Sequence, residues 1–153
     1  MAFHPDGRHI ISGSSDATVR VWELTHQTCV LTLYGHTGEV NCVAISGDGR
    51  VAVSGGNDRL IFSWDVQAGK QLWHADAKAE QVYCIVISPD GTRVLSGGSD
   101  GFIRAWNLRT GREIGVLNGH AGPVRGLAFS SDGKYLVSCG DDCTVRLWGQ
   151  SKS

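Results

Sequence analysis

Residues 35–65 read GHTGEVNCVAISGDGRVAVSGGNDRLIFSWD, and this stretch decides the fold. Three apolar runs, VNCVAIS, VAVSGG and LIFSWD, alternate in it with the turn signals GDG and ND. Runs this short and this rich in β-branched residues predict strands of about five to seven residues rather than helices. A fourth run, QLWHA, follows the turn QAGK. Because Asp-Gly and Ala-Gly suit tight turns, the pattern predicts a small antiparallel sheet.

The same layout returns every 42 residues without an insertion or deletion. Three residue types share this spacing, namely Trp22, Trp64, Trp106 and Trp148, Asp16, Asp58, Asp100 and Asp142, and Ser12, Ser54, Ser96 and Ser138. The Asp-Gly turns that begin at Asp6, Asp48, Asp90 and Asp132 keep the same step. A four-stranded sheet of this size cannot bury both of its faces alone, so we expect neighbouring sheets to cover one another.

At these residues the chain resembles the WD-repeat (Trp-Asp) β-propeller family, in which four-stranded blades surround a central channel. Gly35-His36 and Gly119-His120 carry the resemblance, since each His precedes the Trp of its repeat by 28 residues. The implied fold is all-β, with four-stranded antiparallel propeller blades, about four repeats and an incomplete ring. We expect one domain over 1–153, with repeats at approximately 1–36, 37–78, 79–120 and 121–153, the first and last incomplete.

The resemblance also implies a buried hydrogen-bonded chain in each blade, running from a loop His through a strand Ser and a turn Asp to a strand Trp. Complete sets are His36, Ser54, Asp58 and Trp64, and His120, Ser138, Asp142 and Trp148; sets without the His are Ser96, Asp100 and Trp106, and Ser12, Asp16 and Trp22. A Ser-His-Asp catalytic site is the alternative interpretation. The regular recurrence favours a structural role, because a nucleophile needs one exposed serine in one cleft.

The third repeat departs from this pattern, because Ala77 and Lys78 take the positions of Gly and His. We therefore expect a looser connecting loop there. An arginine column, Arg20, Arg104 and Arg146, is interrupted by Phe62 and is interpreted as a solvated edge rather than an anion site.

Partner binding in this family often uses the narrower face around the channel, at positions beside the first valine of the innermost strand and just before the turn Asp. Here those positions hold Glu39, Asn41, Asn57, Gln81, Tyr83, Ser99, Pro123, Arg125, Asp141 and Ser15. They vary on an otherwise constant frame, which favours a recognition surface, although exposed residues released from packing would vary in the same way. Tyr83 and Arg125 are the expected anchors, because aromatic and Arg side chains dominate interface energetics. Trp73, outside the Trp column, is either a rim contact or cover for a blade edge.

Composition narrows the choice of partner. Fourteen Lys and Arg against 15 Asp and Glu give a formal charge of -1, with no basic run, so nucleic acid and membrane are not expected as partners. The five cysteines include no Cys-x-x-Cys pair, and we expect reduced thiols and a cytoplasmic protein. No paired carboxylates, phosphate-binding glycine loop or His cluster with ligand spacing was found outside the repeat columns, so neither catalysis, a cofactor nor a metal is expected.

The expected function is therefore a non-catalytic scaffold that binds proteins or peptides. Two alternatives stay open. The chain is a target-recognition or regulatory segment of a larger protein containing an enzyme such as a kinase or protease, or it is a half-propeller that pairs with itself through open blade edges. Met1 aligns with Val43 and Leu127 in a strand, which predicts that the chain is a fragment of a longer propeller.

Overall fold

The computed structural model describes residues 1–149, and within them the chain forms strands and turns without a helix. The first sheet contains β1 (Ala2–Phe3), β2 (His9–Gly13), β3 (Thr18–Glu23) and β4 (Thr28–Tyr34). The second contains β5 (Val40–Ile45), β6 (Val51–Gly56), β7 (Leu60–Asp65) and β8 (Lys70–Asp76). The third contains β9 (Val82–Ile87), β10 (Arg93–Gly98), β11 (Phe102–Asn107) and β12 (Glu113–Asn118), and the last β13 (Val124–Phe129), β14 (Tyr135–Gly140) and β15 (Val145–Gly149).

Every sheet is a simple antiparallel meander, with its strands paired in chain order. The register repeats with the sequence: Ser54 lies opposite Phe62, and Ser96 lies opposite Arg104. Each of the three complete sheets also has a bulge at its Trp-bearing strand, between that strand and the outermost one. The all-β prediction is confirmed, as is the prediction of antiparallel blades in an open row. In the described part of the chain no helix could cross a membrane.

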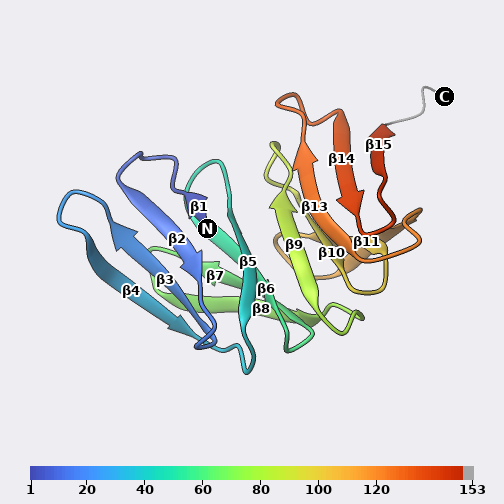
Figure 1. Cartoon of the computed structure of the whole chain (residues 1–153). Coiled ribbons are helices and arrows are strands. Elements are labelled where there is room, and N and C mark those ends of the chain that lie inside the picture. Colours follow the sequence, from blue (N-terminus) through green and yellow to red (C-terminus); the bar gives the residue numbers. More distant parts are fainter. Residues whose placement is uncertain (150–153) are drawn as a thin grey trace.

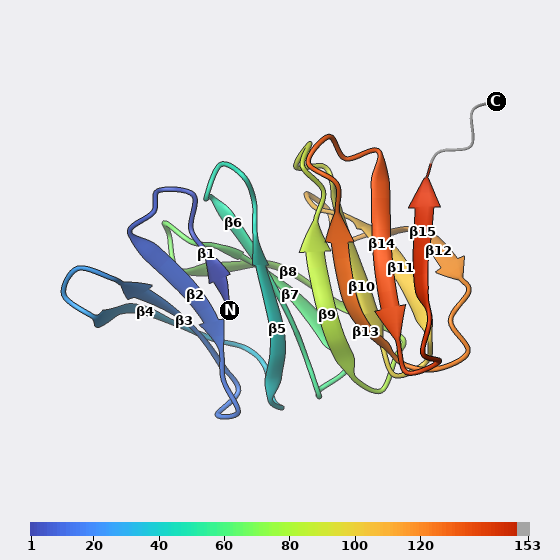
Figure 2. The same cartoon turned by 45° about the horizontal axis from the view of Figure 1, so that its top comes forward.

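The four sheets stand side by side, with the innermost strands β1, β5, β9 and β13 turned toward a common hollow (Figures 1 and 2). Neighbouring sheets approach most closely at a glycine near the end of each second strand. A Cβ on Gly55 would lie 2.5 Å from Val82 Cγ1, and one on Gly97 would lie 2.7 Å from Val124 Cγ1. Only glycine allows this approach, because real Cβ atoms do not come so near to another carbon.

The hydrophobic core lies between the sheets rather than within any one of them. Between the first two sheets, Ile11, Val19 and Val21 pack with Val40 and Trp64, and Trp64 is 1% exposed. The fourth sheet has no following sheet among residues 1–149, and the consequence is visible in one repeat column. Val19, Ile61 and Ile103 are 1%, 0% and 1% exposed, whereas Val145 is 74% exposed. The apolar face of the fourth sheet is therefore uncovered.

Candidate protein-binding face

A directional hydrogen-bond chain joins the loop before β5, the turn between β6 and β7, and the strands β6 and β7 of the second sheet. His36 Nδ1 lies 2.7 Å from Asp58 Oδ2, and Nε2 lies 2.8 Å from Ser54 Oγ. Because a carboxylate only accepts, His36 Nδ1–H donates to Asp58, and Nε2 then accepts the hydroxyl proton of Ser54. The Ser54 oxygen in turn accepts the indole N–H of Trp64 at 2.9 Å. Burial lowers the pKa of His36 by disfavouring its charged form, so the imidazole is neutral in this chain.

The fourth sheet repeats the arrangement around His120. Its Nδ1 lies 3.0 Å from the Asp142 carboxylate, its Nε2 lies 2.7 Å from Ser138 Oγ, and Trp148 Nε1 donates to Ser138 at 2.8 Å. The hydrogen bond from His120 holds the pKa of Asp142 well below its usual range. The structure thus brings together both complete sets of residues, and the side chains of His36 and His120 have no exposed surface. These serines are buried, which is unlike an attacking nucleophile in an open cleft.

The other two sheets keep only the Trp–Ser contact. Trp22 donates to Ser12 at 2.8 Å, and Trp106 donates to Ser96 at 2.9 Å. The turn aspartates use the arginine column instead: Asp100 pairs with Arg104 at 2.6 Å, and Asp16 pairs with Arg20. Our interpretation of this column as a solvated edge was wrong for Arg104, whose side chain is only 11% exposed. The four-residue step from the turn Asp to the Arg, which recurs at Asp16–Arg20 and Asp100–Arg104, is the sequence signal that could have revealed this ion pair.

The loop without a histidine is held by other contacts. Ala77 and Ala79 are buried at 2% and 4% exposure, and Lys78 Nζ lies 2.7 Å from Glu113 Oε2. Trp73 also acts between sheets, because its indole N–H donates to the Leu108 carbonyl at 2.7 Å. It is therefore an inter-sheet contact, which neither interpretation from the sequence included.

The predicted face residues gather where β5, β9 and β13 begin and where the second and third strands of each sheet are joined. In the second sheet they form a polar chain: Asn41 Nδ2 donates to Asn57 Oδ1 at 2.7 Å, and Asn57 Nδ2 donates to Glu39 Oε2 at 3.1 Å. Asn41 Nδ2 also donates to the Val82 carbonyl at 3.0 Å, which ties this chain to the third sheet. The amide groups of Asn41 and Asn57 are thus held in fixed orientations by their neighbours.

The third and fourth sheets contribute an aromatic and ionic cluster. The Arg125 guanidinium lies over the Tyr83 ring, 4.2 Å from its centroid, and forms a two-point pair with Asp141 at 2.9 and 2.6 Å. The Tyr83 hydroxyl donates to the side-chain carbonyl of Gln81. The hydrogen bond from Arg125 lowers the pKa of Asp141, so this carboxyl stays ionised. Arg125 and Asp141 remain about half exposed, at 48% and 45% of their side chains.

The remaining predicted residues have structural contacts or none. The Ser99 hydroxyl accepts the backbone N–H of Gln81 at 3.2 Å, and the Pro123 carbonyl accepts the backbone N–H of Asp141 at 2.9 Å. Ser15 is exposed on the turn between β2 and β3. Cys42 and Cys84, in one repeat column, point between sheets, and burial raises the pKa of Cys84 to about 12. All five cysteines are free thiols.

Comparison with known families agrees with this geometry. The family model "WD40: WD domain, G-beta repeat" matches residues 1–23, 27–65, 69–107 and 111–149. The chain belongs to the WD40 family. Each match ends with the Trp of the repeat column and the residue that follows it. The match over 27–65 takes β4 from the first sheet and β5 to β7 from the second, and the matches over 69–107 and 111–149 likewise link two blades, whereas the match over 1–23 lies within the first sheet.

Similar curated proteins also carry this repeat. The nuclear distribution protein PAC1 of Scheffersomyces stipitis is 47% identical over 47 residues, which are 27% of this chain and 9% of that protein. Pre-mRNA-processing factor 19 homolog 2 of Arabidopsis thaliana is 42% identical over 45 residues, which are 29% of this chain and 9% of that protein. The probable E3 ubiquitin ligase complex SCF subunit sconB of Emericella nidulans is 47% identical over 36 residues, which are 24% of this chain and 5% of that protein. The chain thus spans less than a tenth of these relatives in each match. WD40 repeats typically mediate protein–protein interaction and are generally not catalytic.

Proposed function

We propose that the chain is a non-catalytic platform that binds a peptide or protein segment across the starts of β5, β9 and β13. The Arg125–Tyr83 stack supports this most directly. It places a partly exposed guanidinium and an aromatic ring side by side near the starts of β13 and β9, and these are the side chains that most often carry binding energy.

The chemistry of the face suggests the kind of segment it takes. Glu39, Asn41 and Asn57 offer acceptors and donors held in place by one another, whereas Arg125 presents a cation beside an aromatic ring. A peptide with exposed backbone amides would pair with these polar groups, and its side chains would pack against the Tyr83 ring and the Arg125 guanidinium. A phosphate backbone is not favoured, because Glu39 and Asp141 place negative charge in the same area.

A peptide-display selection on the immobilised wild-type chain tests the proposal. Peptides that saturate the wild type are then measured against the double variant Tyr83→Ala, Arg125→Ala by fluorescence anisotropy. The matched control is Tyr135→Ala, Arg112→Ala, which removes the same two residue types from exposed positions at the opposite ends of the strands. We expect at least tenfold weaker binding for the face variant, by analogy with residues that dominate other interfaces, and unchanged binding for the control. Equal affinity of both variants would move the site elsewhere on the blades.

The proposal includes a cytoplasmic location and no cofactor. Five free cysteines support the location, because secreted domains generally use their cysteines in disulfides. Where the platform is one part of an enzyme-containing protein, its role would be target recognition, and the same binding assay applies to the longer chain.

A further inference from the structure

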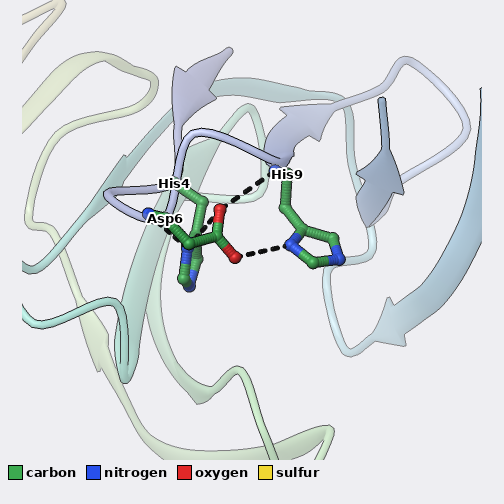
Figure 3. A group of neighbouring side chains, drawn as sticks. All are labelled: His4, Asp6 and His9. Carbon is green, nitrogen blue, oxygen red and sulfur yellow. Dashed lines mark hydrogen bonds and ion pairs between the residues drawn. The ribbon is translucent and has the colours of Figure 1, made fainter. Parts of the chain in front are cut away.

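A cluster of two imidazoles and one carboxylate lies at the turn between β1 and β2, away from the face described above. His4 Nδ1 lies 3.0 Å from Asp6 Oδ1, and His9 Nδ1 lies 2.7 Å from Asp6 Oδ2. Figure 3 shows these three side chains around the turn, with the Asp6 carboxylate directed toward the His9 ring. One ligand atom from each residue lies within 4.8 Å of the other two. The sequence search for ligand spacing overlooked this H-x-D-x-x-H pattern.

The orientation of His4 is set by the second sheet. Its Nε2 lies 3.1 Å from the carbonyl oxygen of Gly49, which accepts only, so Nε2–H is the donor. The ring packs directly on this turn, because a Cβ on Gly49 would lie 2.6 Å from His4 Nε2. A backbone carbonyl that fixes a ring in this way is the usual outer partner of a metal-binding histidine.

This tautomer leaves the Nδ1 lone pair of His4 facing the Asp6 carboxylate. Within residues 1–149 the donor to this nitrogen is the backbone N–H of Asp6, at 3.2 Å, which is the longest hydrogen bond of the cluster. In the neutral imidazole, two acceptor atoms, His4 Nδ1 and Asp6 Oδ1, therefore lie 3.0 Å apart without a proton between them. The backbone N–H groups of Arg8 and His9 also donate to Asp6 Oδ1, at 2.8 and 3.1 Å, and hold the carboxylate in place. A cation between these atoms would relieve their repulsion.

The other repeats provide an internal comparison. The position of His4 holds Ser46, Ser88 and Ser130, and each of these hydroxyls donates to the turn Asp of its own repeat, for example Ser46 to Asp48 at 2.6 Å. The position of His9 holds Val51, Arg93 and Tyr135. The turn therefore forms without histidine, and the first repeat has two imidazoles beside an Asp that all four repeats share. Closing the turn does not explain them.

We propose that His4, Asp6 and His9 form a binding site for a divalent transition metal of the Zn²⁺ class. Imidazole and carboxylate ligands suit Zn²⁺, Ni²⁺ and Cu²⁺ better than Mg²⁺. Bonds of about 2.0–2.1 Å in a tetrahedron separate ligand atoms by roughly 3.3 Å, so the three side chains need only small rotations to close around the ion. Metal binding at His9 Nδ1 displaces the proton that this nitrogen shares with Asp6, and the ring carries its one proton on Nε2 instead, so that a neutral imidazole binds the ion. Three ligands at a partly exposed turn leave a fourth position for water.

Metal titration of the full, untagged chain tests this site. The exposed thiols of Cys29, Cys139 and Cys143 are first alkylated, so that they cannot bind metal. Zn²⁺ binding is measured by calorimetry and Co²⁺ binding by its visible spectrum, with Mg²⁺ as the non-binding ion. The variants are His4→Ser and His9→Val, which introduce the residues of the second repeat at these positions. The control is His26→Ser, since His26 also faces a carboxylate three residues away, at 2.8 Å, without a second histidine.

We expect one equivalent of metal on the wild type and on His26→Ser. His4→Ser and His9→Val should each bind more weakly by at least the ~10- to 100-fold that loss of an outer partner costs at metal sites. Circular dichroism confirms that the variants fold, and imidazole proton spectra of the wild type should show shifts in two histidines. Unchanged affinity in both variants, or no saturable Zn²⁺ binding to the wild type, would overturn the proposal and leave a carboxylate–imidazole hydrogen-bonded turn.

Discussion

The guanidinium of Arg125 stacks over the ring of Tyr83, 4.2 Å from the ring centroid, although the two residues are 42 positions apart. They occupy the same position of neighbouring repeats, the second residue of β13 and of β9. One repeat column therefore becomes a line of adjacent side chains on the proposed binding face, because neighbouring blades stand side by side.

This stack predicts a signal in nuclear magnetic resonance spectra. Protons of the Arg125 side chain should be shifted upfield by the Tyr83 ring current, and Tyr83→Leu should abolish that shift. Asp141→Asn should reduce it, since the Asp141 carboxylate holds the guanidinium in place through two hydrogen bonds. The control is Tyr34→Leu, a change at an exposed tyrosine on β4. Arg125 shifts that stay the same in Tyr83→Leu would show that the stack does not persist in solution.

Two equivalent serines should differ in their contribution to stability. Ser54→Ala leaves both the Trp64 indole N–H and His36 Nε2 without a partner, whereas Ser96→Ala leaves only the Trp106 indole N–H. An unsatisfied buried polar group costs about 1–3 kcal/mol, so Ser54→Ala should lower the free energy of unfolding more than Ser96→Ala does. Urea unfolding, monitored by tryptophan fluorescence, measures the free energy of unfolding of both variants. An equal or larger loss for Ser96→Ala would contradict the network.

Stability should fall as the solution is acidified below the ordinary pKa of histidine. Burial lowers the pKa of His36 from its ordinary value of 6.5, so the unfolded chain binds a proton at a higher pH than the folded chain does. The free energy of unfolding therefore decreases as pH drops below about 6.5 and until the lower, folded pKa is passed. Urea midpoints at pH 7.5, 6.5 and 5.5 measure this slope, which should be smaller in His36→Gln. The prediction fails if the wild type gains stability over this range.

The uncovered face of the fourth sheet should cause self-association of the 153-residue chain. Val145 and Leu147 are 74% and 68% exposed, and they share a face with Val137 and Cys139 through the β14–β15 pairing. Apolar surface beside an unpaired strand edge favours contact with another copy. Sedimentation velocity should show a larger fraction of oligomers as the concentration of the chain rises. That fraction should be smaller in the double variant Val145→Thr, Leu147→Lys. Tyr34→Thr, Leu72→Lys, at other exposed apolar positions, should behave like the wild type.

The sequence by itself determined the repeat. A period of 42 residues assigns Ser54, Ser96 and their equivalents to one environment, and the alternation of apolar runs with turns gives antiparallel strands. Because these features depend on neighbours within one hairpin, local sequence is sufficient to predict them. The pairing of Ser with Trp came from the family resemblance and was found at 2.8 to 2.9 Å in all four sheets.

Only the tertiary structure decided the contacts between blades. Three contacts each join two sheets, namely Tyr83 with Arg125, Trp73 with Leu108, and His4 with Gly49. Such pairs depend on the distance and the angle between neighbouring sheets. A periodic sequence predicts the same contacts for every repeat, so it cannot indicate which repeat forms a particular inter-sheet pair. The close approach of Gly55 and Val82 sets the distance between the second and third sheets. Side chains that differ from the other residues of their repeat column then contact the residues of the next sheet that lie within this distance.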